Sequence, residues 1–345
     1  MNNRFHRCEY WIMIVLTSSI LFGCTKYLPD NTDAFANDSR FTQTVYQPIL
    51  GRNNLFANNF NAGSSTQPLD FEIVNLRRTA DGSPAPELTN NYPVKIWTQA
   101  YTGTEKTIAE IDSKRTIQNQ PLFSVRKHNG EFLMWAGAQS GIVRAQPDSG
   151  YVFDVKVSNT GGSKYFRNLR LIPQRERAYE PSNYDPVNGI AANSYVNPLS
   201  INNVIGQNTK LDIPLKDVRI FFYKNPNATT TGGKTLTFRF YDAGFNVIDP
   251  NKFNQTVWAT LVHGFNMEKT SAYVKYDVAY PIPLVTFQTP YTNVAGTQAH
   301  TVFSYDRLNS GGFRESSSIV FDFAIYEEGN WEIIMVFSGD TPLFN

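Results

Sequence analysis

Apolar and polar residues alternate along much of the chain from residue 69 onward. Leu69, Phe71 and Ile73 are separated by Asp70 and Glu72, and this period of two is typical of strands with one buried face. Similar runs recur at residues 122–127, 131–135, 151–157, 165–172, 218–223, 235–241, 273–280, 301–305, 319–326 and 331–337. The pattern therefore predicts a chain built mainly from short strands.

Turn signals separate several of these runs. His128-Asn129-Gly130 lies between the runs 122–127 and 131–135, and Asn-Gly in such a position is a strong β-hairpin signal. Residues 327–330 (EEGN) lie between the last two runs and predict another hairpin. Only residues 105–116 look helical, with Thr107 and Glu110 at the spacing of a capping box.

Many short strands with little helix predict an all-β protein made of antiparallel β-sandwiches. Residues 173–200 contain four prolines together with many polar residues, which indicates a boundary. We therefore expect a first sandwich domain at 67–175, a linker at 176–200 and a second sandwich domain at 201–345. The domains are expected to be immunoglobulin-like or jelly-roll-like, with one short helix. One continuous large sandwich is the alternative.

The first 23 residues predict an export signal. Two arginines precede an apolar run at 11–22, which is shorter than the roughly 20 residues of a membrane-spanning helix. The sequence LFGC at 21–24 resembles the signal of bacterial lipoproteins, which implies that Cys24 is lipidated and becomes the first mature residue. Residues 24–66 would then form a lipidated tether and a leading segment. An ordinary signal peptide or an N-terminal anchor is the alternative.

Charge and cysteine content narrow the function classes. The 31 basic and 30 acidic residues nearly balance, so the chain lacks the basic excess of nucleic-acid-binding proteins. Removal of residues 1–23 would leave 29 of each sign and a formal net charge of zero. It would also remove Cys8, so Cys24 would be the only cysteine and no disulfide within the mature chain would be possible.

Catalytic and metal-binding motifs are missing from the sequence. It contains no HExxH, Walker, nucleophile-elbow or dinucleotide-binding motif. His128 and His300 stand alone, and His263 is expected to be structural, with its imidazole bonded to the backbone. We therefore expect no metal, no cofactor and no enzymatic activity. A glycan-acting hydrolase remains an alternative, and its candidate carboxylates are Asp242, Asp249, Glu327 and Glu328.

Aromatic residues make up 14% of the chain. Most are expected in sandwich cores, but flat rings on loops also bind sugars. The candidate ligand-binding residues are Trp97, Trp135, Tyr179, Tyr184 and Trp258. Core or interface packing is the alternative for each of them.

Several distinctive strings accompany the lipoprotein signal. They are YLPD at 27–30, YQPILGR at 46–52, GSPAPE at 82–87, YEPSNYDP at 179–186 and VHGFNM at 262–267. With them the whole chain resembles a family of uncharacterised Bacteroidota lipoproteins. That resemblance implies a lipid-anchored outer-membrane protein, often associated with starch-utilisation-type systems in which accessory sandwich lipoproteins capture glycans for a TonB-dependent transporter. It implies no catalytic residue.

Together these observations predict a non-catalytic outer-membrane lipoprotein that binds a carbohydrate or other nutrient beside a transport system. The expected partners are the membrane, through Cys24, a glycan, and a TonB-dependent transporter or other envelope proteins, but no nucleic acid. The alternative is a structural or assembly subunit of an envelope complex. Whether the protein faces the cell surface or the periplasm stays open.

Overall fold

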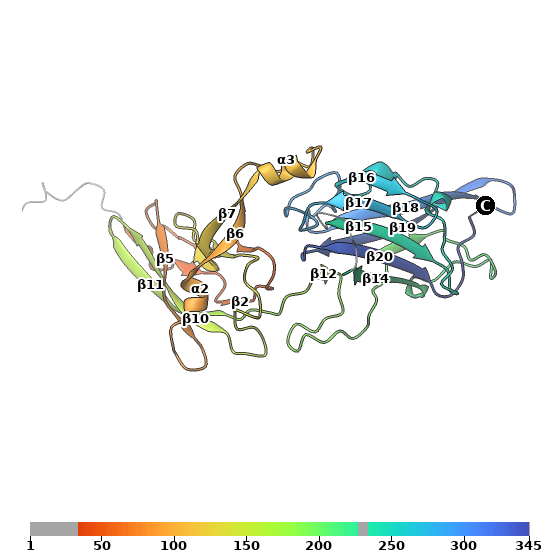
Figure 1. The fold of residues 1–345 in the computed structure, drawn as a ribbon. Coiled ribbons are helices and arrows are strands. Elements are labelled where there is room, and N and C mark those ends of the chain that lie inside the picture. Colours follow the sequence, from red (N-terminus) through yellow and green to blue (C-terminus); the bar gives the residue numbers. More distant parts are fainter. Residues whose placement is uncertain (1–33, 227–233, 345) are drawn as a thin grey trace, which may run out of the picture.

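The computed structural model describes residues 34–226 and 234–344. Its strands form several mainly antiparallel sheets, with two short α-helices (Figure 1). This confirms the predicted all-β sandwich class. The predicted signal peptide, the lipidation site Cys24 and the start of the tether lie outside the described residues.

Two large hydrophobic cores divide the described chain. One contains residues from Phe41 to Leu171, and we call the structure around it the N-terminal unit. The other contains residues from Val196 to Phe337 and defines the C-terminal unit. Figure 1 shows the two units side by side along the molecule.

The elements of the N-terminal unit are mostly short strands. In chain order they are β1 (Arg40–Phe41), β2 (Val45–Tyr46), β3 (Asn54–Phe56), β4 (Phe60–Asn61), β5 (Asp70–Arg78), α2 (Pro86–Thr89), β6 (Asn91–Trp97), α3 (Ile108–Ser113), β7 (Arg115–Pro121), β8 (Phe123–Val125), β9 (Phe132–Met134), β10 (Tyr151–Asn159) and β11 (Gly162–Leu171). A four-stranded sheet in the order β2-β11-β10-β5 and a three-stranded sheet in the order β3-β9-β8 both contribute to the core. Tyr46, Phe132 and Phe153 form contacting rings within it.

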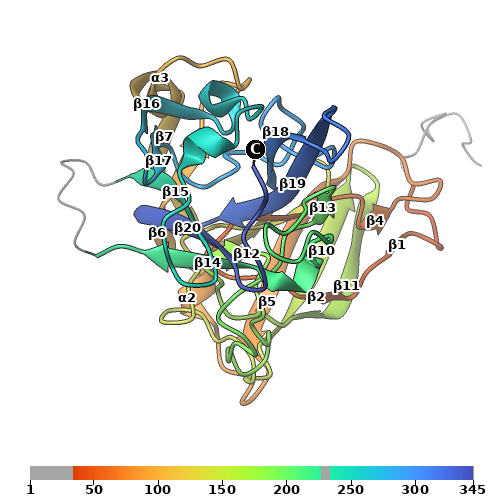
Figure 2. The same cartoon turned by 90° about the vertical axis from the view of Figure 1, so that its right-hand side faces the viewer.

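The C-terminal unit has longer strands. They are β12 (Tyr179–Glu180), β13 (Ser200–Asn202), β14 (Val218–Lys224), β15 (Thr235–Tyr241), β16 (Gly264–Lys269), β17 (Val274–Val278), β18 (Ala299–Leu308), β19 (Arg314–Ile325) and β20 (Asn330–Phe337), with 3-10 turns η2 (Leu215–Asp217), η3 (Pro250–Lys252) and η4 (Trp258–Thr260). One sheet has the order β14-β20-β15-β17-β16, and the other is built on β19, which pairs with β12, β13 and β18. Figure 2 shows these two layers.

The boundaries of the units are less simple than their sequence suggests. Phe41, Tyr46 and Leu50 are buried in the N-terminal core, so the leading segment before residue 67 is part of that unit. Within the proline-rich stretch, β12 pairs with β19 and Tyr179 packs against the C-terminal core. Strand pairing therefore attaches part of the predicted linker to the C-terminal unit.

The two predicted hairpins have different outcomes. β8 and β9 pair in antiparallel fashion around His128-Asn129-Gly130, as predicted. The turn at 327–330 does not form a hairpin: β20 pairs with β14 and β15, whereas β19 lies in the other sheet. That prediction was wrong because the same turn residues also suit a connection that crosses between sandwich layers.

The helix expected at 105–116 is shorter than predicted, at residues 108–113. Thr107 is its N-cap, and the Thr107 hydroxyl accepts from the Glu110 amide at 3.0 Å. Glu110 accepts from the Lys106 amide rather than from that of Thr107, so only half of the capping box is present. A second helix, α2, was not predicted; it is a single turn that begins at Pro86. No helix in the described residues is long and apolar enough to cross a membrane.

An arm formed by β6, α3 and β7 extends from the N-terminal unit and reaches the C-terminal unit (Figure 1). Its Tyr101 and Ile111 are buried together with Ala279 in a small third cluster. The Arg115 guanidinium donates to the carbonyl of Tyr280 at 2.8 Å, and Lys95 forms an ion pair with Glu328 at 2.9 Å. The arm therefore connects the two units through both apolar and charged contacts.

Candidate functional site

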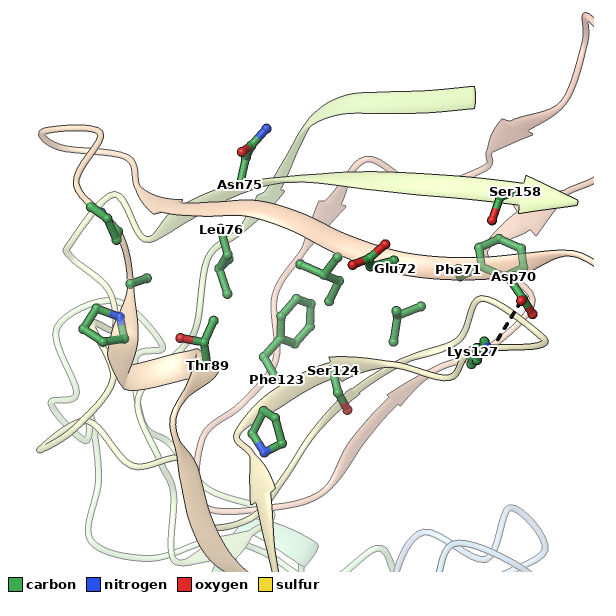
Figure 3. Close-up of a pocket in the computed structure, with 16 residues that line it drawn as sticks. Asp70, Phe71, Glu72, Asn75, Leu76, Thr89, Phe123, Ser124, Lys127 and Ser158 are labelled. Carbon is green, nitrogen blue, oxygen red and sulfur yellow. Dashed lines mark ion pairs between the residues drawn. The ribbon is translucent and has the colours of Figure 1, made fainter. Parts of the chain in front are cut away.

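An open groove of about 910 Å³ runs between β5 and β8 in the N-terminal unit (Figure 3). Its volume is within the usual range of ligand sites. β5 is the last strand of the four-stranded sheet and β8 is the last strand of the three-stranded sheet. The groove therefore lies where two sheet edges face each other, with α2 near one end.

The floor of the groove is apolar. Ile73 and Val125 are half-buried, and Phe123 is almost fully buried. The ring of Phe123 packs against Phe153 and Phe132 of the core, with centroids 5.3 and 5.7 Å away. Because these rings are held by the core, the floor is rigid.

A backbone hydrogen bond closes one end of the groove. The amide of Phe71 donates to the carbonyl of Lys127 at 2.7 Å. Nearby Gly130 has a φ of +72°, and a Cβ there would lie 2.7 Å from the Phe71 ring. A glycine is therefore required where the β8–β9 turn meets β5.

Polar side chains form the rim at this closed end. The Asp70 carboxylate lies 2.9 Å from Nδ1 of His128 and 3.5 Å from Nζ of Lys127. Glu72, two residues along β5, is exposed at the same rim. Figure 3 shows Asp70 and Lys127 together at one side of the groove. The rim thus combines two carboxylates with a lysine and can bind polar groups of a ligand.

The other end of the groove is held by side chains around α2. Arg78 forms an ion pair with Glu87 at 2.8 Å, and the Tyr151 hydroxyl donates to Glu87 at 3.1 Å. Burial alone would raise the pKa of Glu87, but its bonds to Arg78 and Tyr151 outweigh burial and lower it. The ionised carboxylate therefore fixes α2 against β5 at neutral pH.

A second candidate site lies at the junction of the two units, around His263. Nε2 of His263 donates to the Glu105 carbonyl at 2.9 Å, and Nδ1 accepts from the Tyr101 hydroxyl. The imidazole also stacks on Tyr291 with centroids 4.7 Å apart. Both ring nitrogens and one face are occupied, and the bond to the backbone predicted for the His263 imidazole is present.

Glu105 is the buried charge of this junction. It is 2% exposed, and its carboxylate accepts from Lys114 at 2.6 Å and from the Thr102 amide at 2.9 Å. Burial alone would raise the pKa of Glu105, but these bonds outweigh it and lower the pKa to about 2. The carboxylate therefore serves to hold the arm rather than to exchange a proton near neutral pH.

The five predicted aromatic residues do not form one site. Trp258 is 6% exposed within the C-terminal core, Trp135 packs on the N-terminal core, and Trp97 packs on Tyr101 in the arm. Tyr179 and Tyr184 lie together in the lining of a small pocket. None of the five lines the β5–β8 groove.

Tyr179 and Tyr184 differ in how free their rings are. The Tyr179 ring stacks on Phe222, with centroids 4.1 Å apart and planes 12° apart. Tyr184 is 38% exposed. Of the five predicted residues, Tyr184 therefore has the ring that a ligand can reach most easily.

The predicted polar candidates lie in turns and ion pairs. Asp242 and Asp249 accept from backbone amides two residues ahead. Glu327 pairs with Lys224 at 2.5 Å, and Glu328 pairs with both Lys95 and Lys234. The remaining histidine, His300, lies 2.7 Å from a carboxylate oxygen of Asp322. Across residues 34–226 and 234–344, no three histidine or acidic side chains gather in a way that could hold a metal ion.

The groove residues were missed by sequence reasoning. The strand 69–74 and the hairpin 122–135 were both predicted, but about fifty residues separate them and nothing in either pattern shows that their edges meet. Pro121 ends β7 two residues before β8 begins, and a proline at such a point is typical of a strand edge. That was the one local signal available.

Comparisons with known proteins give a family but no function. None of the curated proteins matches this chain. The family model described as "Domain of unknown function (DUF5007)" matches residues 60–345, which covers both units except for β1 to β3. The chain therefore belongs to the DUF5007 family.

Proposed function

We propose that this protein is a non-catalytic, lipid-anchored protein of the bacterial outer membrane that captures a nutrient ligand in the β5–β8 groove. The observation that carries the proposal is the groove itself, with its rigid apolar floor and polar rim. Captured ligands would pass to a neighbouring transport system, such as a TonB-dependent transporter. The anchor is the lipid expected on Cys24.

The surroundings of the carboxylates favour binding over catalysis. Glycoside hydrolysis needs two carboxyl groups that flank the bond to be broken. In the groove, Asp70 is paired with Lys127 and His128, and the four carboxylates considered from sequence accept bonds in turns or ion pairs elsewhere. A hydrolase therefore stays the weaker alternative.

A role as a structural or assembly subunit has one observation in its favour. Apolar side chains lie exposed on loops of the C-terminal unit; they are Leu211, Phe245, Val257 and Phe313. Side chains of this kind on loop tips suit contact with another protein. This second candidate predicts a protein partner that binds the C-terminal unit without using the groove.

The test is a ligand screen followed by one groove variant and a matched control. The full chain in detergent is screened against oligosaccharides and peptides by thermal shift. Each hit is repeated with Ile73→Arg, which places a charge on the groove floor, and with Ile117→Arg, which changes an apolar residue of β7 that is 67% exposed. We expect at least a tenfold loss of affinity in the first variant and no change in the second. Hits that bind Ile73→Arg as well as the unchanged protein would overturn the proposal.

A further inference from the structure

Apolar side chains line most of the β5–β8 groove, and charged side chains lie toward its closed end (Figure 3). The apolar part of the lining includes Ile73, Leu76, Val125, Pro84, Pro86 and Pro121. Proline has no backbone amide, so the three prolines offer a ligand apolar surface without a hydrogen-bond donor. The lining therefore suits a ligand with an apolar body, which needs few hydrogen bonds.

The aromatic rings of the lining are not available for stacking on a ligand. Phe71 and Phe123 are 6% and 3% exposed, and the Phe71 ring packs edge-to-face on Phe60 with centroids 5.0 Å apart. No tyrosine or tryptophan lines the groove in the part of the chain that the structure describes. Exposed flat rings and several polar groups are what a sugar chain needs, so this lining favours a more apolar ligand.

The charged side chains of the groove leave one carboxylate without a counter-ion. Asp70, Glu72 and Lys127 are the charged residues in the described lining. Lys127 lies 3.5 Å from Asp70, and His128 lies 2.9 Å from the same carboxylate. Glu72 makes no ion pair with a described residue, although Lys156 stands opposite it in β10. Two carboxylates and one lysine give this end of the groove a net negative charge beside an apolar floor.

We infer that the groove binds a small amphipathic molecule with an apolar body and a single cationic group, an amine or a guanidinium; this rests on the proposed function of the same groove. The cationic group lies beside Glu72, and the apolar body covers Ile73, Leu76 and Val125. Glu72 and Leu76 are four residues apart on β5, which is at most about 13 Å at the rise of a strand. This distance sets the length of the body, and the attraction to Glu72 orients it along the groove.

The experiment uses three probes that share one apolar body and differ in charge. They are 4-phenylbutylamine, which is cationic at neutral pH, 4-phenylbutanol and 4-phenylbutyrate. Their affinities for the full chain in detergent are measured by isothermal titration calorimetry. We expect the amine to bind about threefold to fivefold more tightly than the alcohol, the range of an ion pair at a surface, and the carboxylate to bind more weakly than the alcohol. One detergent is used throughout, so partition of a probe into micelles affects every protein variant equally.

Two charge variants test the role of Glu72. Glu72→Gln removes the charge and keeps the size of the side chain, so the affinity of the amine should fall to that of the alcohol. The matched control is Glu110→Gln, which changes an exposed carboxylate of the arm outside the groove and should keep the preference for the amine. Lys156→Gln removes the positive charge opposite Glu72 and should strengthen binding of the amine by about twofold.

A third variant tests the apolar floor. Val125→Thr replaces a methyl group by a hydroxyl group at nearly constant size, so it should weaken binding of the amine and of the alcohol alike, by about threefold. The methyl NMR signals of Ile73 should shift when either probe binds, which places the probe in the groove. If Val125→Thr does not fold, the comparison between the amine and the alcohol in Glu72→Gln still decides.

Several results would contradict the inference. Equal affinity of the amine and the alcohol would exclude a role for the charge, as would absence of binding by the amine. A preference for the amine that persists in Glu72→Gln would place the cationic group elsewhere. If only oligosaccharides or peptides bind, and Ile73→Arg abolishes their binding, the inference fails but the proposed function stands. If no probe and no member of the ligand screen depends on Ile73, the proposed function fails as well.

Discussion

The two units differ in how the edge strands of their sheets are covered. In the C-terminal unit, the edge strand β14 is covered by Val196, whose amide and carbonyl both bond with Ile220. The other edge strand, β16, contains Phe265, which packs with the arm in the third cluster. In the N-terminal unit, the outer edge of β5 bonds with Lys127 at one end and with residues 83–85 at the other, and the groove opens between these two ends. The comparison teaches that one sandwich is completed by its own chain, whereas the other leaves a gap suited to a ligand.

The largest effect in this comparison is expected from the C-terminal core. Phe303 is fully buried and contacts Phe238, Phe240 and Trp258. Phe303→Ala should lower the free energy of unfolding by about 3–5 kcal/mol, because it removes contacts and leaves a cavity. Thermal unfolding followed by circular dichroism measures this. The control is Phe313→Ala, since Phe313 is 72% exposed. An equal loss of unfolding free energy in both variants would contradict the burial of Phe303 in the core.

The next largest effect is expected from acid, through the buried carboxylate of Glu105 in the arm. The pKa of Glu105 is about 2 in the folded chain, so the unfolded chain takes up this proton at higher pH than the folded one does. Stability from Glu105 is therefore complete above the unfolded pKa and is lost as the pH falls from about 5 to about 2, by at most about 3 kcal/mol.

Denaturant unfolding at several pH values measures this loss. Glu105→Gln should remove that part of the pH dependence, whereas Glu110→Gln, which changes an exposed residue of the same arm, should keep it. If the Glu105→Gln protein loses the same stability as the pH falls, another group is responsible for the pH dependence.

A smaller effect is expected when the arm loses one hydrogen bond. Tyr101→Phe removes the hydroxyl that donates to Nδ1 of His263 and leaves a half-buried acceptor without its partner, which costs about 1–2 kcal/mol. Limited proteolysis of residues 98–114 should become faster. Tyr165→Phe is the control because Tyr165 is 51% exposed. If residues 98–114 are also cleaved faster in this control, the effect is not specific to the hydrogen bond between Tyr101 and His263.

The smallest effect on stability is expected from Tyr184, whose exposed ring lies in the predicted linker at 176–200. Tyr184→Ala should change the free energy of unfolding by no more than about 0.5 kcal/mol, since Tyr184 is 38% exposed. Chemical denaturation measures this. A loss of more than 1 kcal/mol would show that the ring is part of the packing of the C-terminal unit. If Tyr184→Ala abolishes ligand binding without loss of stability, the binding site is the small pocket lined by Tyr179 and Tyr184 and not the groove.

Much of the fold was predictable because strand signals are local. The alternation at 151–157 and 235–241 marks β10 and β15, and Asn129-Gly130 marks the β8–β9 hairpin. The strand β6 was missed although Tyr92, Val94 and Ile96 alternate with exposed residues, because it contains Pro93, and proline is rare inside strands. The turn at 327–330 was read as a hairpin because a turn signal does not say which sheet the next strand joins.

The candidate site was less predictable than the fold. The aromatic residues chosen from composition are mostly engaged in packing: Trp258 in the C-terminal core and Tyr179 against Phe222. The sequence does not distinguish an aromatic residue exposed on a loop from one buried in a core. The groove depends on which strand edges meet, and the local pattern of neither strand shows this.

The sequence by itself determined the all-β class, most strands, one hairpin and the bond of the His263 imidazole to the backbone. These follow from periodicity, turn chemistry and residue type, which act over a few neighbouring residues. Only the tertiary structure decided that β19 and β20 lie in different layers, that the arm joins the two units, and that β5 and β8 leave a groove. Those features depend on which distant strand edges meet, and the free energy of that choice comes from packing the whole core.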